Sequence, residues 1–160
     1  MNFFLLRNVL LVSILIIVNG CNYKPLFDQD QLKSFAVKSY EINGDKRVAQ
    51  VLVNKLSIVR DKSGKFNIII FAKKETNIAN KSSSGKILEY SVTLNYDVKV
   101  KNNITSEIIY SKNVSNTQNY KSSKLYSESK NREKKIVENI SGIVASQITN
   151  ELSLQFQDDF

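Results

Sequence analysis

Residues 88–100 read Leu-Glu-Tyr-Ser-Val-Thr-Leu-Asn-Tyr-Asp-Val-Lys-Val, and this stretch decides the fold. Apolar or aromatic residues alternate strictly with polar ones from its first residue to its last. Side chains repeat every two residues in a strand and every 3.6 in a helix, so only a strand places all the apolar ones on one side. The pattern predicts a long strand with one buried face and one polar face, the latter carrying Glu89, Ser91, Thr93 and Asn95.

The chain after this strand contains a turn, a second strand and a helix. Asn102-Asn103 predicts a turn, so residues 104–114 are expected to return as the other strand of a hairpin. From about Ser123 the pattern becomes helical, with a charged and exposed first half over residues 127–135. An apolar stripe at helical spacing then follows, made of Ile136, Ile140, Ile143, Val144, Ile148 and Leu152.

The chain before the long strand contains a strand–helix–strand unit. Residues 34–42 are predicted to form a strand that ends at the turn signal Asn43-Gly44. Asp45 can cap a helix over residues 46–60, whose apolar residues recur every three or four positions. Residues 66–72 are predicted to form a second strand, and residues 76–85 a polar loop.

A crossover helix between two strands predicts that the strands are parallel. The expected fold is therefore an α+β two-layer sandwich in which two helices cover a four-stranded mixed sheet, in the order β-α-β-β-β-α.

Residues 1–20 have the features of a secretory signal. Arg7 is their only charge, and an apolar run follows from Val9 to Val18. The apolar stretch is shorter than the roughly 20 residues that a spanning helix needs, which makes a permanent membrane span the weaker interpretation. The sequence Val18-Asn19-Gly20-Cys21 comes next and resembles the lipobox of bacterial lipoproteins, although Asn19 departs from the usual small or hydroxyl residue.

The lipobox resemblance implies cleavage between Gly20 and Cys21. Cys21 would then carry a diacylglyceryl group on its sulfur and an acyl chain on its nitrogen, which anchors the protein stably. The predicted organisation is a signal peptide over 1–20, a lipidated tether over 21–33 and a single domain over 34–160. Asn22 stands where an Asp commonly retains lipoproteins in the inner membrane, so the resemblance implies the outer membrane. The alternative is an ordinary signal with a chance cysteine at its end.

Composition excludes several classes of protein. The chain has 42% hydrophobic residues and one proline, as expected of a folded protein. Its single cysteine permits no intrachain disulfide, and the absence of histidine removes the commonest zinc sites and every His-dependent triad. We find no catalytic motif and no metal or cofactor motif apart from the Cys21 lipid, so we expect no enzyme.

The net charge of +8 permits two interpretations. It can attract anions, or it can reflect lysine-rich coding on solvated faces. Nucleic acid is not an expected partner, because an exported, membrane-tethered chain does not normally meet it and no aromatic-basic binding motif occurs.

Two stretches and the order of elements resemble the LPS-assembly lipoprotein family, LptE, in its alphaproteobacterial-type form. The first stretch is Cys21-Asn22-Tyr23-Lys24-Pro25-Leu26-Phe27. The second pattern comprises Glu89-Tyr90, Tyr96, Tyr120, Leu125-Tyr126 and Ile148-Thr149-Asn150-Glu151-Leu152. Members of that family plug an outer-membrane β-barrel, LptD, help it assemble and help lipopolysaccharide reach the outer leaflet. The resemblance implies three partners: LptD, lipopolysaccharide, and outer-membrane lipid through Cys21 on the periplasmic face.

Two surfaces are candidates for these contacts. Lys99, Lys101 and Lys112 flank the predicted hairpin and could hold the phosphates of lipopolysaccharide. The alternative is that they maintain solubility and block edge pairing. The polar strand face could meet the polar interior of a wide barrel or simply face solvent. A different class of function also stays open, namely a lipid-anchored periplasmic binding or accessory domain of another envelope transport complex.

Overall fold

The computed structural model describes residues 35–156. The predicted signal peptide 1–20, its cleavage site at Gly20, the lipidated Cys21 and the tether 21–33 lie outside these residues. The elements are, in chain order, β1 (Val37–Gly44), α3 (Lys46–Lys55), β2 (Phe66–Lys81), β3 (Ile87–Asn102), β4 (Ile108–Lys121) and α4 (Tyr126–Gln155).

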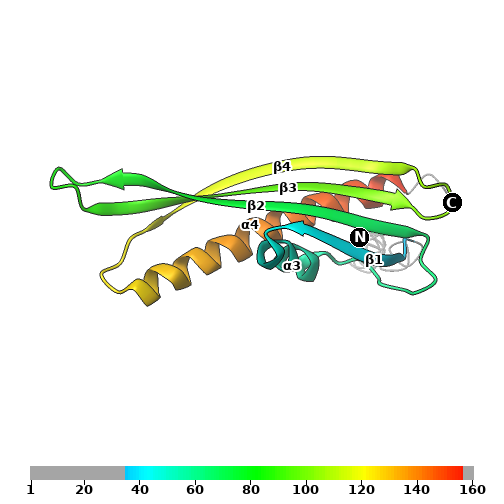
Figure 1. Cartoon of the computed structure of the whole chain (residues 1–160), viewed down its shortest axis with the longest axis horizontal. Helices are drawn as coiled ribbons and strands as arrows, with labels where there is room; N and C mark the ends of the chain where they lie inside the picture. Colours follow the sequence, from blue (N-terminus) through cyan, green and yellow to red (C-terminus); the bar gives the residue numbers. More distant parts are fainter. Residues whose placement is uncertain (1–34, 157–160) are drawn as a thin grey trace, which may run out of the picture.

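The strands form one sheet in the order β1-β2-β3-β4, and both helices lie on one side of it (Figure 1). β1 and β2 are parallel, as the strand–helix–strand unit predicts, and the other neighbours are antiparallel. The predicted α+β two-layer sandwich with a four-stranded mixed sheet is confirmed.

β3 supplies the centre of the core. The side chains of Val92, Leu94, Tyr96, Val98 and Val100 are fully buried, while the residues between them are partly exposed. β3 pairs with β2 along one edge and with β4 along the other, so it is a central strand. The strict alternation of residues 88–100 therefore has the origin that the sequence predicts: one face packs under the helices and the other is open.

α4 covers this core with a buried stripe made of Val137, Ile140, Val144, Ile148 and Leu152. The predicted stripe was wrong at Ile143, whose side chain is 47% exposed.

One polar pair is buried between α4 and the sheet. The Tyr96 hydroxyl lies 2.7 Å from the Ser141 hydroxyl, which itself donates to the Val137 carbonyl at 2.6 Å. The pair links β3 to α4 by a chain of hydrogen bonds.

α3 is shorter than the predicted helix 46–60. Its start is as predicted, because the Asp45 carboxylate accepts from the backbone N–H groups of Arg47 and Val48 at 3.1 and 3.2 Å. It ends at Lys55, because the following segment pairs with the start of β1 instead of continuing the helix. Val37 donates to the Val59 carbonyl at 2.9 Å, and Asp61 donates to the Val37 carbonyl at 3.0 Å.

The largest difference from the predicted elements is in β2, which runs to Lys81 instead of residue 72. The predicted polar loop 76–85 is mostly strand, because this polar segment is paired along its length with the first half of β3. Smaller corrections concern the other boundaries: β1 covers 37–44 instead of 34–42, β3 covers 87–102 instead of 88–100, β4 covers 108–121 instead of 104–114, and α4 starts at 126 instead of 123.

Candidate functional site

The face of the sheet that the helices leave open is lined mainly by hydroxyl and amide side chains. The register aligns Ser91 of β3 with Asn77 of β2 and Asn119 of β4. One row further, the hydroxyls of Thr93 and Thr117 lie 2.8 Å apart. We call this surface the open face; its members are Asn67, Ile69, Phe71, Lys73, Glu75 and Asn77 of β2, the odd-numbered residues 89–101 of β3, and Ser111, Asn113, Ser115, Thr117 and Asn119 of β4.

Several charges of the open face are neutralised within it. Lys73 lies 2.6 Å from Glu75, and Lys99 lies 3.3 Å from Asp97. The chain's positive surplus is therefore not concentrated here. Phe71 is 49% exposed among these polar groups and is the large apolar side chain most open to solvent on β2. The surface is thus low in net charge and exposes one aromatic side chain, a residue type that is enriched in protein interfaces.

The three lysines predicted to hold phosphate do not lie together. Lys99 and Lys101 are on the open face, because they alternate with the buried residues of β3. Lys112 is directly opposite Val98, and residues directly opposite in an antiparallel pair share a face, so Lys112 is on the helix side. Its ammonium lies 2.9 Å from Glu151 of α4. The hairpin therefore does not gather them into one cationic cluster.

A different pocket lies towards the opposite end of the sheet, between the first part of α4 and the strands. Its volume is 370 Å³, and we call it the tyrosine pocket after Tyr90, Tyr120 and Tyr126. The rings of Tyr90 and Tyr120 are stacked with centroids 5.4 Å apart. Lys130 places its ammonium 5.6 Å from the centroid of the Tyr126 ring. The remaining lining residues are Thr76, Ser122, Ser123, Lys124, Ser129 and Glu133.

An ion cluster forms the inner wall of the tyrosine pocket. The Glu133 side chain is buried, and its two carboxylate oxygens lie 2.7 Å from Lys74 and 2.8 Å from Lys130. Burial by itself would raise the pKa of Glu133, but the hydrogen bonds and charges of the two lysines outweigh it and hold that pKa below its ordinary value. Burial is also the main reason that the pKa of Tyr120 is raised, so its hydroxyl keeps its proton.

The Glu133 cluster predicts a pH-dependent stability. We expect Glu133→Gln to lower the free energy of unfolding near neutral pH by about 1–3 kcal/mol, because it leaves Lys74 partly buried without its counter-charge. A carboxylate whose pKa is lowered on folding stabilises the fold above its unfolded pKa, and that contribution is lost as the pH falls through the folded value. The difference in free energy of unfolding between wild type and variant, measured by urea titration, should therefore become smaller below about pH 4.

The matched control for this prediction is Glu138→Gln. Glu138 is more exposed and lies 3.9 Å from Lys134. Pairs of this kind contribute about 0–1 kcal/mol, so the control should show little difference at any pH. If Glu133→Gln lowers the free energy of unfolding by the same amount from acid to neutral pH, the stabilising role of the Glu133 carboxylate is contradicted.

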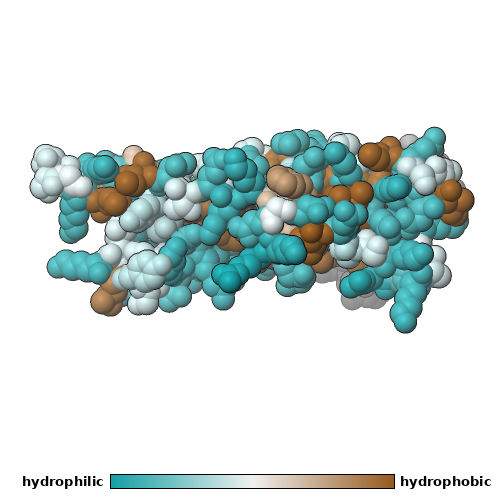
Figure 2. All heavy atoms as spheres, in the orientation of Figure 1, coloured by the Kyte–Doolittle hydropathy of each residue, from teal (hydrophilic) through white to brown (hydrophobic). Residues whose placement is uncertain are grey.

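The tyrosine pocket combines groups that suit an anionic amphiphile. Its phenol and serine hydroxyls can bond to hydroxyl-rich groups, and Lys124 can hold phosphate or carboxylate by charge-assisted hydrogen bonds. Lys130 is paired with Glu133, but the cluster of Lys74, Lys130 and Glu133 keeps one net positive charge. Apolar side chains are exposed beside it: Ile78, which pairs with Tyr90, and Leu125, which precedes α4. Figure 2 shows hydrophobic side chains among hydrophilic ones at the end of the molecule where β2 and β3 turn.

Sequence reasoning noted the three tyrosines as part of a family resemblance but did not place them in a site. Tyr90 and Tyr120 are thirty positions apart, and they meet only because the β3–β4 register sets them directly opposite. Tyr126 is the first residue of α4, which begins three residues later than predicted, and it lines the same pocket. No spacing in the sequence carries this information; the only available signal was the repeated occurrence of tyrosine in the resemblance.

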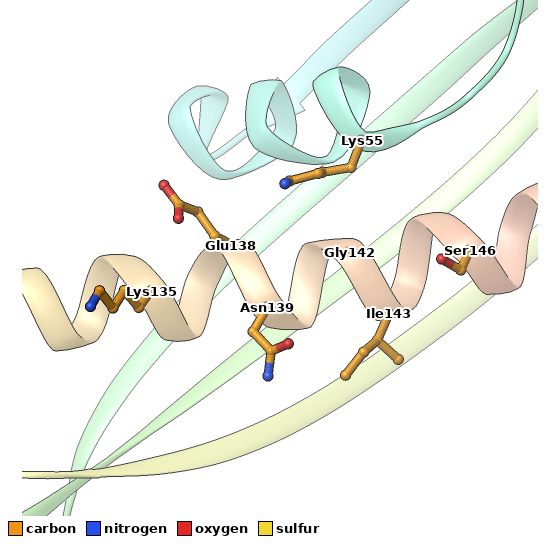
Figure 3. Close-up of a pocket in the computed structure, with 7 residues that line it drawn as sticks. All are labelled: Lys55, Lys135, Glu138, Asn139, Gly142, Ile143 and Ser146. Carbon is orange, nitrogen blue, oxygen red and sulfur yellow. The ribbon is translucent and has the colours of Figure 1, made fainter.

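A second hollow lies along the outer side of the helices, with a volume of 540 Å³ (Figure 3). Lys55 of α3 and residues of α4 line it, namely Lys135, Glu138, Asn139, Gly142, Ile143 and Ser146. Figure 3 shows Asn139 and Ile143 on the side of α4 that points away from α3. None of the predicted site residues lies here.

Within residues 35–156, neither helix has both the length and the apolar composition needed to cross a membrane. No protein-family model matches the sequence, and no curated protein matches it.

Solved structures do share the fold. Rare lipoprotein B of Shewanella oneidensis matches with a TM-score of 0.54 at 11% identity, over 75% of this chain and 97% of that one. A candidate lipoprotein of Caulobacter crescentus matches with a TM-score of 0.60 at 10% identity, over 82% and 96%. A minor lipoprotein of Acinetobacter baumannii matches with a TM-score of 0.53 at 14% identity, over 76% and 92%. This chain is thus similar in fold to proteins described as bacterial lipoproteins.

Proposed function

We propose that this chain is an outer-membrane lipoprotein of the LptE type, which plugs the LptD β-barrel, helps it assemble and assists lipopolysaccharide transport to the outer leaflet. Two lines of reasoning support the lipoprotein part. Residues 18–21 resemble a lipobox that ends in Cys21, the only cysteine of the chain. The fold is similar to solved proteins described as lipoproteins, and the match extends over most of their length.

The observation that carries the plug proposal is the open face. The uncovered side presents mainly serine, threonine and asparagine, and its three lysines are balanced by three acidic residues. Two of these lysines, Lys73 and Lys99, are paired with the neighbouring Glu75 and Asp97. Such a surface can exchange hydrogen bonds with the polar interior of a wide barrel and brings no net charge into the contact.

We place the lipopolysaccharide contact at the tyrosine pocket instead of the predicted hairpin. Lys112 is on the other side of the sheet from Lys99 and Lys101 and is held by Glu151, so the three cannot grip one phosphate together. The tyrosine pocket brings Lys124 beside aromatic rings and hydroxyls, and the adjoining cluster of Lys74, Lys130 and Glu133 adds one net positive charge. A phosphorylated glycolipid offers the matching phosphate, sugar hydroxyls and acyl chains.

The test is affinity purification of the full-length protein from detergent-solubilised outer membranes. We expect an acylated Cys21 in the intact mass of the mature protein and a co-purifying β-barrel. Ser91→Arg, in the middle of the open face between Asn77 and Asn119, should reduce recovery of the barrel strongly. The matched control Gln50→Arg adds the same charge on the exposed side of α3 and should leave recovery unchanged.

Three outcomes would contradict the proposal. An unmodified Cys21 would remove the lipoprotein assignment. Recovery of the protein alone, at near-stoichiometric yield, would favour the alternative of a lipid-anchored binding or accessory domain. Equal barrel recovery with both arginine variants would remove the open face as the contact surface. The pocket assignment is tested separately by Lys124→Glu, which should weaken retention of purified lipopolysaccharide while the barrel is still recovered.

A further inference from the structure

The inner faces of β2 and α4 both change from apolar to ionic at the same level. On β2, the buried residues of the helix side end with Ala72, and the next residue on that side is Lys74. On α4, the buried apolar stripe begins at Val137, and Glu133 lies about one turn before it. The Glu133 carboxylate and the Lys74 ammonium meet at 2.7 Å. This ion pair is therefore the boundary between the apolar core and the tyrosine pocket.

Glu133 has two cationic partners, although one would neutralise it. In the part of the chain that the structure describes, it is the only buried acidic side chain. Lys74 and Lys130 contact different oxygens of its carboxylate, at 2.7 and 2.8 Å. A buried carboxylate needs a counter-charge, because an unpaired one is costly to keep ionised. A single ammonium group provides that counter-charge, so one of the two lysines is not required for neutrality.

The two lysines differ in how firmly they are held. The Lys74 side chain is 31% exposed, and that of Lys130 is 53% exposed. The more exposed ion pair is the weaker one, because solvent screens it. Of the two lysines, Lys130 is also the one that lines the tyrosine pocket. If a ligand in the pocket competes with Glu133 for an ammonium group, Lys130 is therefore the lysine that is released.

Lys130 is already positioned for such a ligand. Its ammonium group has three N–H donors, of which Glu133 accepts one, and it lies 5.6 Å from the centroid of the Tyr126 ring. These two contacts hold the side chain at the wall of the pocket, so its capture by a ligand costs less conformational entropy. Lys124 lines the same pocket. Lys124 and a released Lys130 present two positive charges to a ligand, while Lys74 and Glu133 remain a neutral pair.

We infer that Lys130 is an exchangeable cation: when a phosphate monoester enters the tyrosine pocket, the Lys130 ammonium passes from Glu133 to the phosphate, and Lys74 alone neutralises Glu133. A phosphate monoester carries about −1.5 to −2 charges near pH 7, which matches the two ammonium groups. A phosphate diester or a carboxylate carries a single negative charge and matches them less well. The inference rests on the proposed function, because it takes the ligand to be a phosphorylated glycolipid.

The first test is Lys130→Met in the full-length protein in detergent micelles. Its affinity for purified lipopolysaccharide should fall by about tenfold, because one charge-assisted hydrogen bond is lost. Affinity for the same lipopolysaccharide after enzymatic removal of its phosphate monoesters should not change. The thermal unfolding midpoint of the empty protein should change little, since Lys74 still neutralises Glu133. The matched control is Lys134→Met on the same helix, an exposed lysine 3.9 Å from Glu138, which should leave both affinities unchanged.

The second test is a rescue that a purely structural role would not give. In Lys74→Met, Lys130 becomes the remaining partner of Glu133 and can no longer be released, so affinity for lipopolysaccharide should fall although Lys74 does not line the pocket. Adding Glu133→Gln removes the need for a counter-charge and should restore the affinity. If Lys74 and Glu133 served only the stability of the fold, the double variant would bind no better than Lys74→Met.

The outcomes separate this inference from the proposed function. An equal loss of both forms of lipopolysaccharide in Lys130→Met would overturn the contact with phosphate. A folded double variant, checked by far-ultraviolet circular dichroism, that still binds weakly would overturn the exchange. If Lys124→Glu weakens binding and Lys130→Met does not, the exchange is wrong while the pocket assignment stands. If the wild type does not bind lipopolysaccharide, the pocket assignment and this inference both fail.

Discussion

Replacing Ile140 with alanine should lower the free energy of unfolding by about 2–5 kcal/mol. Ile140 is fully buried in the middle of the stripe with which α4 covers the sheet, and it belongs to the same apolar cluster as Val92, Leu94 and Val98. The substitution removes the methyl and methylene groups that contact the core and leaves a cavity that the packed strands cannot close. Urea unfolding of wild type and variant, followed by far-ultraviolet circular dichroism, measures the difference.

The matched control is Leu154→Ala on the same helix. Leu154 is 63% exposed, so the same kind of truncation should change stability by less than about 0.5 kcal/mol. A similar loss for both variants would mean that the buried stripe of α4 does not contribute the packing energy that its burial indicates.

The second large effect is expected from Gly64→Ala. A Cβ atom built on Gly64 would lie 2.6 Å from the Ala36 carbonyl oxygen, 2.7 Å from the Lys38 nitrogen and 2.8 Å from the Val37 carbonyl carbon. All three are backbone atoms at the start of β1, and none can rotate away as a side-chain end could. We expect a loss of about 3 kcal/mol, at the upper end for overpacking, visible as a lower midpoint of thermal unfolding.

The same substitution at Gly142 is the control, because a Cβ there meets no atom within 4 Å. Gly142 lies inside α4, where alanine is favoured over glycine by about 0.5–1 kcal/mol, so Gly142→Ala should raise the midpoint. If both variants are equally destabilised, the tight approach of Gly64 to β1 is not the cause.

The parts of the fold that follow from local pattern were predictable. Strict alternation identified β3, because a half-buried strand imposes a period of two on its residues. The Asp45 cap and the strand–helix–strand order predicted the start of α3 and the parallel pairing of β1 with β2. The second half of β2 was missed, because Lys73, Lys74 and Glu75 show no strand pattern. That segment is a strand because a complete partner strand lies beside it.

The candidate site was less predictable because it depends on register. Lysines on the two strands of one hairpin are expected to lie close together, yet Lys112 and Lys101 are on opposite sides of the sheet. A shift by a single residue exchanges the two sides of a strand, and β3 and β4 do shift register between Val100 and Lys101. The tyrosine pocket needs the pairing of Tyr90 with Tyr120, which no local pattern encodes.

The Tyr96–Ser141 pair fixes how the two layers are aligned. The Ser141 hydroxyl gives its proton to the Val137 carbonyl, so the phenol of Tyr96 must be the donor to Ser141. Sliding α4 by one turn, or rotating it by one residue, would leave that phenol without a hydrogen-bond partner among aliphatic groups. An unsatisfied buried donor of this kind costs about 1–3 kcal/mol. Aliphatic side chains alone tolerate several such arrangements. This one hydroxyl pair therefore selects a single alignment of α4 relative to the sheet.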